Sequence, residues 1–148
     1  HDADSPVGQT VQITHRDGKN YLVSPHKLGV PMSDHFLSRT FNHIELKRDG
    51  HILEITLNRP ESYNALFSAA HFELAEIFDE FEQDQELWVA IVTGAGEKAF
   101  CSGNDLKVTA SGGDMSVPTS GFAGLCSRTN REKPVIAEIA RSFRRARR

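Results

Sequence analysis

Between residues 44 and 94 the apolar residues of this 148-residue sequence change their spacing twice. They first alternate with polar residues in "FNHIELKRDGHILEITLN", which is typical of two strands that each bury one face. The residues on those faces are Ile44 and Leu46 in the first run and Ile55 and Leu57 in the second. The pair Asp49–Gly50 between the runs predicts a hairpin with a type I′ turn. Pro60 ends the second strand because proline has no amide proton to donate.

The next segment, "SAAHFELAEIFDEFEQD" from Ser68 to Asp84, has helical spacing, and Ser68 is the predicted N-cap. Its apolar side chains recur every three or four residues, at Ala70, Leu74, Ile77, Phe78 and Phe81. Its acidic side chains fill the opposite side, at Glu73, Glu76, Asp79, Glu80 and Glu82. The pattern predicts an amphipathic helix on a sheet, with these carboxylates on a solvated face.

A short apolar run, "LWVAIVTG", follows this helix and predicts a buried strand closed by Gly94. A strand after a helix favours an α/β layered fold. The run at Val135 to Ala137 in "KPVIA" predicts the start of another buried strand. The small polar stretch "TASGGDMSVPTSGFAG" between the two predicts a mobile or ligand-ordered loop.

The two ends of the sequence differ from its centre. Residues 1–31 are polar and interrupted by glycine and proline, and only "NYLVS" reads as a short strand. We expect residues 1–40 to be a poorly ordered extension, with two interpretations open: a true extension, or sequence upstream of a start at Met32. The last eight residues hold five arginines, and a basic tail of this kind could contact nucleic acid or anionic membrane. It lacks helical capping and aromatic interleaving, which favours a simple tail.

Composition argues against several classes of protein. A net charge of −3 argues against a nucleic-acid-binding protein as a whole. No apolar run approaches the ~20 residues of a membrane span, and the start does not resemble a signal peptide. The two cysteines leave a disulfide open but favour a reduced, cytoplasmic protein. The seven histidines show no metal-ligand spacing, so we predict no metal site.

The segment "TGAGEKAFCSGNDLK" invites three interpretations. Gly94 and Gly96 after a strand are compatible with a phosphate loop, but no helix or Gly-Lys-Ser/Thr follows, which favours a tight turn. Cys101 has no histidine near it in the sequence, which favours a semi-buried small residue over a nucleophile. Asp105 is placed to cap the amide groups of a helix that starts after it.

The ordered set "ITLNRPESYNAL", an amphipathic helix, "WVAIVTGAGEKAFCSGNDLK" and "KPVIA" resembles the enoyl-CoA hydratase/isomerase (crotonase) superfamily. The resemblance covers Ile44 to Ala137 and implies the N-terminal half of a crotonase-like ββα layered fold, with a partial domain at 41–137. The basic residues 138–148 depart from the family pattern. The implied function is hydration or Δ3,Δ2 double-bond isomerisation of enoyl-CoA thioesters in fatty acid metabolism, and the "SGND" form resembles some isomerases.

The resemblance also implies a site. The backbone N–H of Asn104 would be the first donor of an oxyanion hole, which stabilises the negative charge that builds on the thioester oxygen. Gly103 would allow the backbone to approach the substrate closely. Two interpretations of Lys107 stay open: a contact with a phosphate of coenzyme A, or a solvated lysine. The substrate-binding residues implied are Ser62, Tyr63, Ala65, Ser102, Gly103, Asn104, Asp105 and Leu106. No cofactor is implied beyond the coenzyme A of the substrate.

The family pattern after "KPVIA" is a glycine-rich turn with the second donor, then catalytic glutamates and helices that complete a trimer or hexamer. Here "EIARSFRRARR" follows instead, so we expect a truncated or frameshifted chain with little or no turnover. The alternative is a non-catalytic fragment that binds CoA thioesters or a partner.

Overall fold

The computed structural model describes residues 11–14, 20–23 and 34–139. Its strands are β1 (Val11–Thr14), β2 (Asn20–Val23), β3 (Ile44–Asp49), β4 (Ile52–Leu57), β5 (Val89–Gly94) and β6 (Val135–Glu138). Its helices are α1 (Asp34–Leu37), α2 (Ser68–Gln83) and α3 (Leu106–Ala110), with the 3-10 turns η2 (Pro60–Ser62) and η3 (Phe122–Gly124). Most of the predicted N-terminal extension and the arginines of the basic tail lie outside the described residues.

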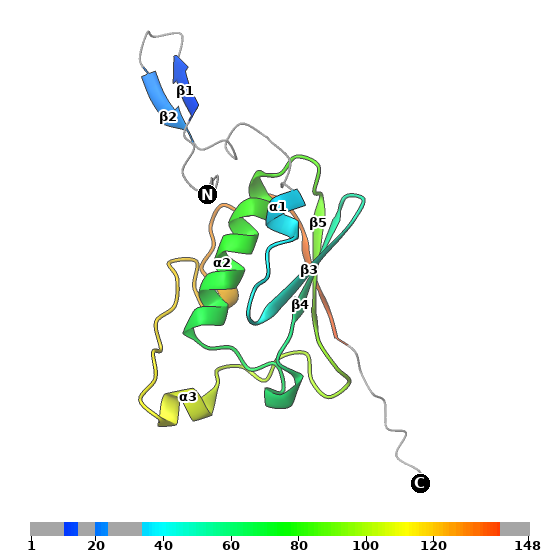
Figure 1. Cartoon of the computed structure of the whole chain (residues 1–148), viewed down its shortest axis with the longest axis vertical. Helices are drawn as coiled ribbons and strands as arrows, with labels where there is room; N and C mark the ends of the chain where they lie inside the picture. The colour runs from blue at the N-terminus through cyan, green and yellow to red at the C-terminus, as the bar shows by residue number, and fades with distance from the viewer. Residues whose placement is uncertain (1–10, 15–19, 24–33, 140–148) are drawn as a thin grey trace, which may run out of the picture.

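A four-stranded sheet in the order β3-β4-β5-β6 carries α2 against one face (Figure 1). β3 pairs antiparallel with β4, whereas β4, β5 and β6 run parallel. The α/β fold class is confirmed. The short strand predicted in "NYLVS" is present as β2, and it pairs with β1, which was not predicted.

The hairpin β3-β4 has the predicted strands but a different turn. Asp49 pairs with Ile52, so the two turn residues are Gly50 and His51. Only Gly50 has a positive φ, at 56°, whereas a type I′ turn needs positive φ at both central residues. The type I′ prediction is therefore wrong, because glycine takes the first central position instead of the second, as in a type II′ turn.

The apolar stripe of α2 forms the centre of the core, as predicted. Its members are all buried: Ala70, Leu74, Ile77, Phe78 and Phe81. They cluster with Leu53, Ile55 and Leu57 of β4. Phe36 of α1 also belongs to this core and makes an edge contact with Phe41, their ring centroids 5.8 Å apart. The packed unit therefore includes residues before the predicted boundary at residue 41.

The acidic side of α2 is not a simply solvated face. Glu73 accepts hydrogen bonds from the backbone N–H groups of Asn42 (3.0 Å) and His43 (3.1 Å), which ties the segment before β3 to the helix. Asp79 pairs with Arg128 at 2.5 Å. The predicted capping role of Ser68 is also wrong, because the helix begins at Ser68 and its N-cap is Phe67.

β5 and β6 are less buried than predicted. Only Ala90 of β5 is buried, since α2 covers one face of the sheet and the other face stays half-exposed. β6 lies at the edge of the described sheet, and Ile136 is 53 % exposed. The apolar runs of these strands therefore do not mark burial on both faces.

The segment between β5 and β6, predicted to be a mobile or ligand-ordered loop, is fixed to α2 at two points. The Ser68 hydroxyl donates to Asp114 Oδ2 at 3.0 Å. Gly124 of η3 lies so close to the helix that an added Cβ would be 2.4 Å from the Ala75 nitrogen. Among the described helices, none is long and apolar enough to cross a bilayer.

Candidate active site

Two loops leave the carboxyl ends of the neighbouring parallel strands β4 and β5 and join edge to edge. Ser102 donates its N–H to the Tyr63 oxygen at 3.1 Å, and Leu66 donates to the Gly103 oxygen at 2.9 Å. Asp105 donates back to the Leu66 oxygen at 2.8 Å. All eight predicted substrate-binding residues lie on these loops or on the first residue of α3. Carboxyl ends of parallel strands are where open α/β sheets bind ligands.

Asn64, which the sequence did not single out, locks the two loops together. It is buried, with a left-handed φ of 54°. Its Oδ1 accepts from the Arg59 N–H at 2.9 Å, and its Nδ2 donates to the oxygens of Ala95 (3.0 Å) and Ala99 (2.8 Å). A Cβ at Gly94 would lie 2.3 Å from the Phe100 oxygen, so close backbone packing explains the glycine there without a phosphate.

Asp105 is the N-cap of α3, as predicted. Its Oδ1 accepts from the N–H groups of Lys107 (3.0 Å) and Val108 (3.4 Å), and its Oδ2 accepts from Arg59 Nη2 at 2.9 Å. The Arg59 guanidinium, assisted by these backbone bonds, lowers the pKa of Asp105 below its ordinary value of 3.8. Asp105 is therefore ionised at neutral pH, and its charge is neutralised locally.

The backbone N–H of Asn104 is left free by this arrangement. Asn104 forms a parallel β-bridge with Leu66, in which Gly103 supplies the carbonyl and Asp105 supplies the N–H. In a parallel bridge the amide of the middle residue points away from the partner strand. Within the described residues no hydrogen bond uses the Asn104 N–H. The predicted oxyanion role requires a backbone donor that is not already used, and the Asn104 N–H is such a donor.

The other predicted site residues differ in what they expose. Tyr63 and Leu106 are 54 % and 77 % exposed, so both side chains are open to a ligand. Ala65 is buried, its N–H donates to the Ser62 oxygen at 3.0 Å, and its oxygen accepts from Arg59 Nη1 at 2.7 Å. Ala65 therefore lies at the candidate site, but its side chain is packed inside the protein and its backbone N–H and oxygen are already hydrogen-bonded.

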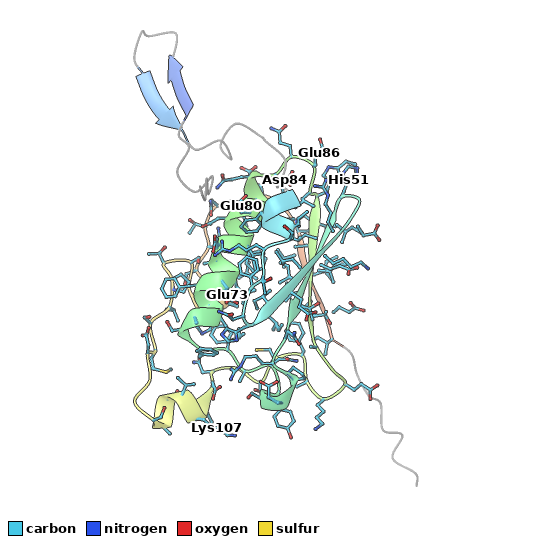
Figure 2. The ribbon with its side chains drawn as sticks, in the orientation of Figure 1. His51, Glu73, Glu80, Asp84, Glu86 and Lys107 are labelled. Atoms are coloured by element: carbon cyan, nitrogen blue, oxygen red, sulfur yellow. The ribbon has the colours of Figure 1, made fainter. Side chains whose placement is uncertain are left out.

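Cationic side chains lie on the same end of the molecule. Lys98 holds its Nζ 5.9 Å from the centre of the Tyr63 ring, beside a pocket of 240 Å³ that Pro60, Gly96 and Lys98 help to line. Figure 2 shows Lys107 at this α3 end, whereas Glu80, Asp84 and Glu86 lie at the other end of α2 and the sheet. Lys98 lies within the segment "TGAGEKAFCSGNDLK" but was not singled out, because its proximity to Tyr63 is set by the fold and not by local spacing.

The cysteines offer no reactive pair. Cys101 is half-buried and packs beside the core, as predicted, and Cys126 is exposed. Both thiols are free, so the disulfide left open by the sequence is not formed in this structure.

Residues 47–141 match the family model of enoyl-CoA hydratase/isomerase, and the chain belongs to this family. It is 49 % identical over 98 residues to a carnitinyl-CoA dehydratase of Escherichia coli K12 and 47 % identical to that of Citrobacter koseri. These matches cover 65 % of this chain and 37 % of each relative. The chain therefore spans little more than a third of the length of those relatives.

Solved structures agree with the assignment. A carnitinyl-CoA hydratase from Mycobacterium avium is 34 % identical, with a TM-score of 0.62 over 68 % of this chain and 39 % of that one. An enoyl-CoA hydratase from Mycobacterium tuberculosis is 37 % identical, with a TM-score of 0.59 over 66 % of this chain and 38 % of that one. The crotonase fold is thus shown for the N-terminal portion that the chain covers.

Proposed function

We propose that the joined loops bind an acyl-CoA thioester and that the Asn104 N–H holds its carbonyl oxygen. The free amide of Asn104, left over by the bridge to Leu66, carries this proposal. A fixed donor is most useful where negative charge develops, because it does not have to reorganise during the reaction. Enolate-like chemistry at a thioester develops charge at that oxygen.

The Arg59–Asp105 pair makes this position suitable for an anion. A carboxylate one residue from the donor would repel a developing oxyanion. The guanidinium at 2.9 Å and the two capping N–H groups offset that charge. Arg59 is therefore proposed to support the site electrostatically while it also holds the Ala65 carbonyl.

The coenzyme A portion is proposed to lie over Tyr63 and Leu106, with Lys98 and Lys107 toward its phosphates. The exposed ring and leucine offer apolar surface, and the two ammonium groups offer positive charge at the same end of the molecule. Ammonium groups act as point charges toward phosphate oxygens.

The reaction that we propose for the complete site is hydration of an enoyl-CoA, or its reverse, a dehydration. The names of the relatives, carnitinyl-CoA dehydratase and enoyl-CoA hydratase, support this direction over isomerisation. We further propose that these 148 residues alone bind with little turnover. A missing oxyanion donor lowers a rate by about 10²–10³, and a missing general base lowers it by about 10²–10⁴.

Calorimetric titration of the chain with butyryl-CoA and with free CoA tests the binding step. We expect butyryl-CoA to bind about tenfold more tightly, since only it brings a carbonyl to the donor. Asn104→Pro removes the backbone N–H and should abolish this preference. Asn104→Ala keeps the N–H and should retain it. Equal dissociation constants for the two ligands in the unmodified chain would overturn the proposal.

Turnover of crotonyl-CoA, followed by loss of its enoyl absorbance, separates the two functional alternatives. Binding without turnover agrees with the thioester-binding fragment. Turnover at the rate of a full-length family enzyme would contradict our expectation of low activity.

A further inference from the structure

The segment between α3 and β6 is tied to α2 at three points. At its start the Ser68 hydroxyl donates to Asp114 Oδ2 at 3.0 Å, and at its end Arg128 Nη2 donates to a backbone oxygen of α2 at 3.1 Å. Between them the backbone N–H of Ala123 donates to Nδ1 of His71 at 3.0 Å. A neighbouring backbone N–H lowers the pKa of Asp114 below 3.8, and arginine stays charged. Only the middle tie therefore titrates near neutral pH.

The middle tie requires a neutral histidine. His71, in the first turn of α2, is 1 % exposed, and its ring centre is 4.7 Å from that of Phe122. A backbone amide can only donate, so Nδ1 accepts from Ala123 while it carries no proton. Protonation would set two donors against each other and bury an uncompensated charge. The hydrogen bond to Ala123 and the charged form of His71 therefore exclude each other.

The backbone at this tie depends on its contacts with α2. Ala123 has a φ of 55°, in the left-handed region that is unfavourable for a residue with a side chain. Such a conformation persists only where the surrounding structure holds it. Here the surroundings are the His71 ring on one side and the close packing of Gly124 on Ala75 on the other. Loss of the His71 bond removes one of the two contacts.

The charged groups on the elements around His71 are already paired. Glu73 on α2 accepts two backbone N–H groups from the segment before β3, and η3 contains no titratable residue. The neighbouring ion pairs are Arg59–Asp105 and Arg128–Asp79. Within the described part of the chain, no ion pair includes His71. Burial lowers the pKa of His71 below its ordinary value of 6.5, so the ring gains affinity for a proton when it is uncovered.

We propose that His71 is a pH-sensitive latch, and that its protonation detaches residues 117–124 from α2 while the ties at Asp114 and Arg128 keep both ends of the segment in place. The segment and α2 form the two walls of a cavity of 670 Å³, which Phe72 and Pro118 help to line. Detachment widens this cavity and uncovers the Phe122 ring, which packs against the core in the closed form. The inference does not depend on the proposed function.

Amide hydrogen exchange of the full chain, resolved by NMR, tests the latch. The quantity is the protection factor of the Ala123 amide, which already corrects for the intrinsic effect of pH on exchange. An opening that gives His71 its ordinary pKa should lower this factor about tenfold between pH 7.5 and 5.5. His71→Gln keeps an acceptor for the Ala123 N–H but has no proton to gain in this range. Its protection factor at Ala123 should stay constant.

His43→Gln is the matched control. His43 is a second histidine beside the start of α2, where its ring centre is 4.7 Å from that of Phe67, the N-cap residue. It makes no contact of the latch type with the segment 117–124, so the variant should keep the tenfold fall at Ala123. A constant protection factor in the unmodified chain, or an equal fall in His71→Gln, would overturn the proposal.

The amide of Ile55, in the central strand β4, shows whether the opening is local. A local detachment exposes Ala123 more often than the core, so at pH 5.5 its protection factor should be at least tenfold below that of Ile55. Equal protection of the two amides would mean that the whole fold opens and that no latch exists. Should His71→Gln not fold, this comparison and the pH dependence of Ala123 in the unmodified chain decide between the same two results.

Discussion

Arg59 donates to the carboxylate of Asp105 at 2.9 Å across 46 positions of sequence, and so joins the loop after β4 to the N-cap of α3. The same guanidinium binds the Ala65 oxygen and lies 4.6 Å from the centre of the Phe67 ring. Arg59 therefore bridges the two loops that form the candidate site, in addition to the bonds of Asn64.

Asp105→Asn should reduce the acid sensitivity of the fold. The pKa of Asp105 is lowered in the folded state, first by Arg59, so its contribution is complete above the ordinary value of 3.8. That stability is lost as pH falls through the folded-state pKa. Urea unfolding of both proteins between pH 6 and 3 is the measurement. The free-energy difference between them should shrink as the pH falls, and a constant difference would contradict the assigned role.

Asn64→Asp should be strongly destabilising. The aspartate keeps an acceptor for the Arg59 N–H but sets a carboxylate against the oxygens of Ala95 and Ala99. Loss of two buried hydrogen bonds with their acceptors left unpaired costs about 2–4 kcal/mol. Chemical unfolding measures this cost. Asn130→Asp, at an exposed asparagine, is the matched control and should change the stability by less than about 0.5 kcal/mol.

Gly94→Ala should cost more than Gly50→Ala. The methyl group at position 94 would lie 2.3 Å from the Phe100 oxygen and 2.6 Å from the Ala99 oxygen. The loop would therefore have to move, which costs about 1–3 kcal/mol of folding free energy or more. At Gly50 the methyl meets nothing within 4 Å, and only the positive φ is unfavourable, by about 1–2 kcal/mol. Equal melting temperatures for the two variants would show that position 94 is not tightly packed.

His71 should make the fold more stable as the pH rises. Its folded-state pKa is lowered, so the unfolded chain binds the proton more readily. Stability therefore falls as the pH drops below about 6.5, down to the folded-state pKa. The melting temperature of the chain between pH 7.5 and 5.5 should fall more steeply than that of His71→Gln. Parallel curves would contradict this role of His71.

The periodic segments could be predicted from the sequence because local spacing reports which face is buried. The stripe from Ala70 to Phe81 is buried as predicted. The turn at Gly50 and the role of Ser68 could not be predicted, since a shift of one residue changes the partner of each group. Short apolar runs also gave no information on burial, because β6 at the sheet edge has the same composition as a central strand.

The sequence predicted which residues belong to the candidate site, but not the distant residues that hold them in place. Motif spacing placed Asn104 and Asp105, and Asp105 caps α3 as predicted. The residues that hold the two loops in space, Arg59 and Asn64, act across 31 to 46 positions, so local spacing does not reveal their partners. The interpretation of the acidic residues on α2 failed for the same reason, since their partners come from distant segments.

The edge position of β6 has a practical consequence for handling the protein. Within the described sheet β6 pairs only with β5, and Ile136 is 53 % exposed. Such an edge is a template on which a second chain can extend the sheet, so concentrated solutions should self-associate. Ile136→Lys places a charge on the strand and should lower the light scattering at high concentration, and unchanged scattering would direct the search to another surface. Self-association would then limit the protein concentration that can be used in the calorimetric titrations with CoA ligands.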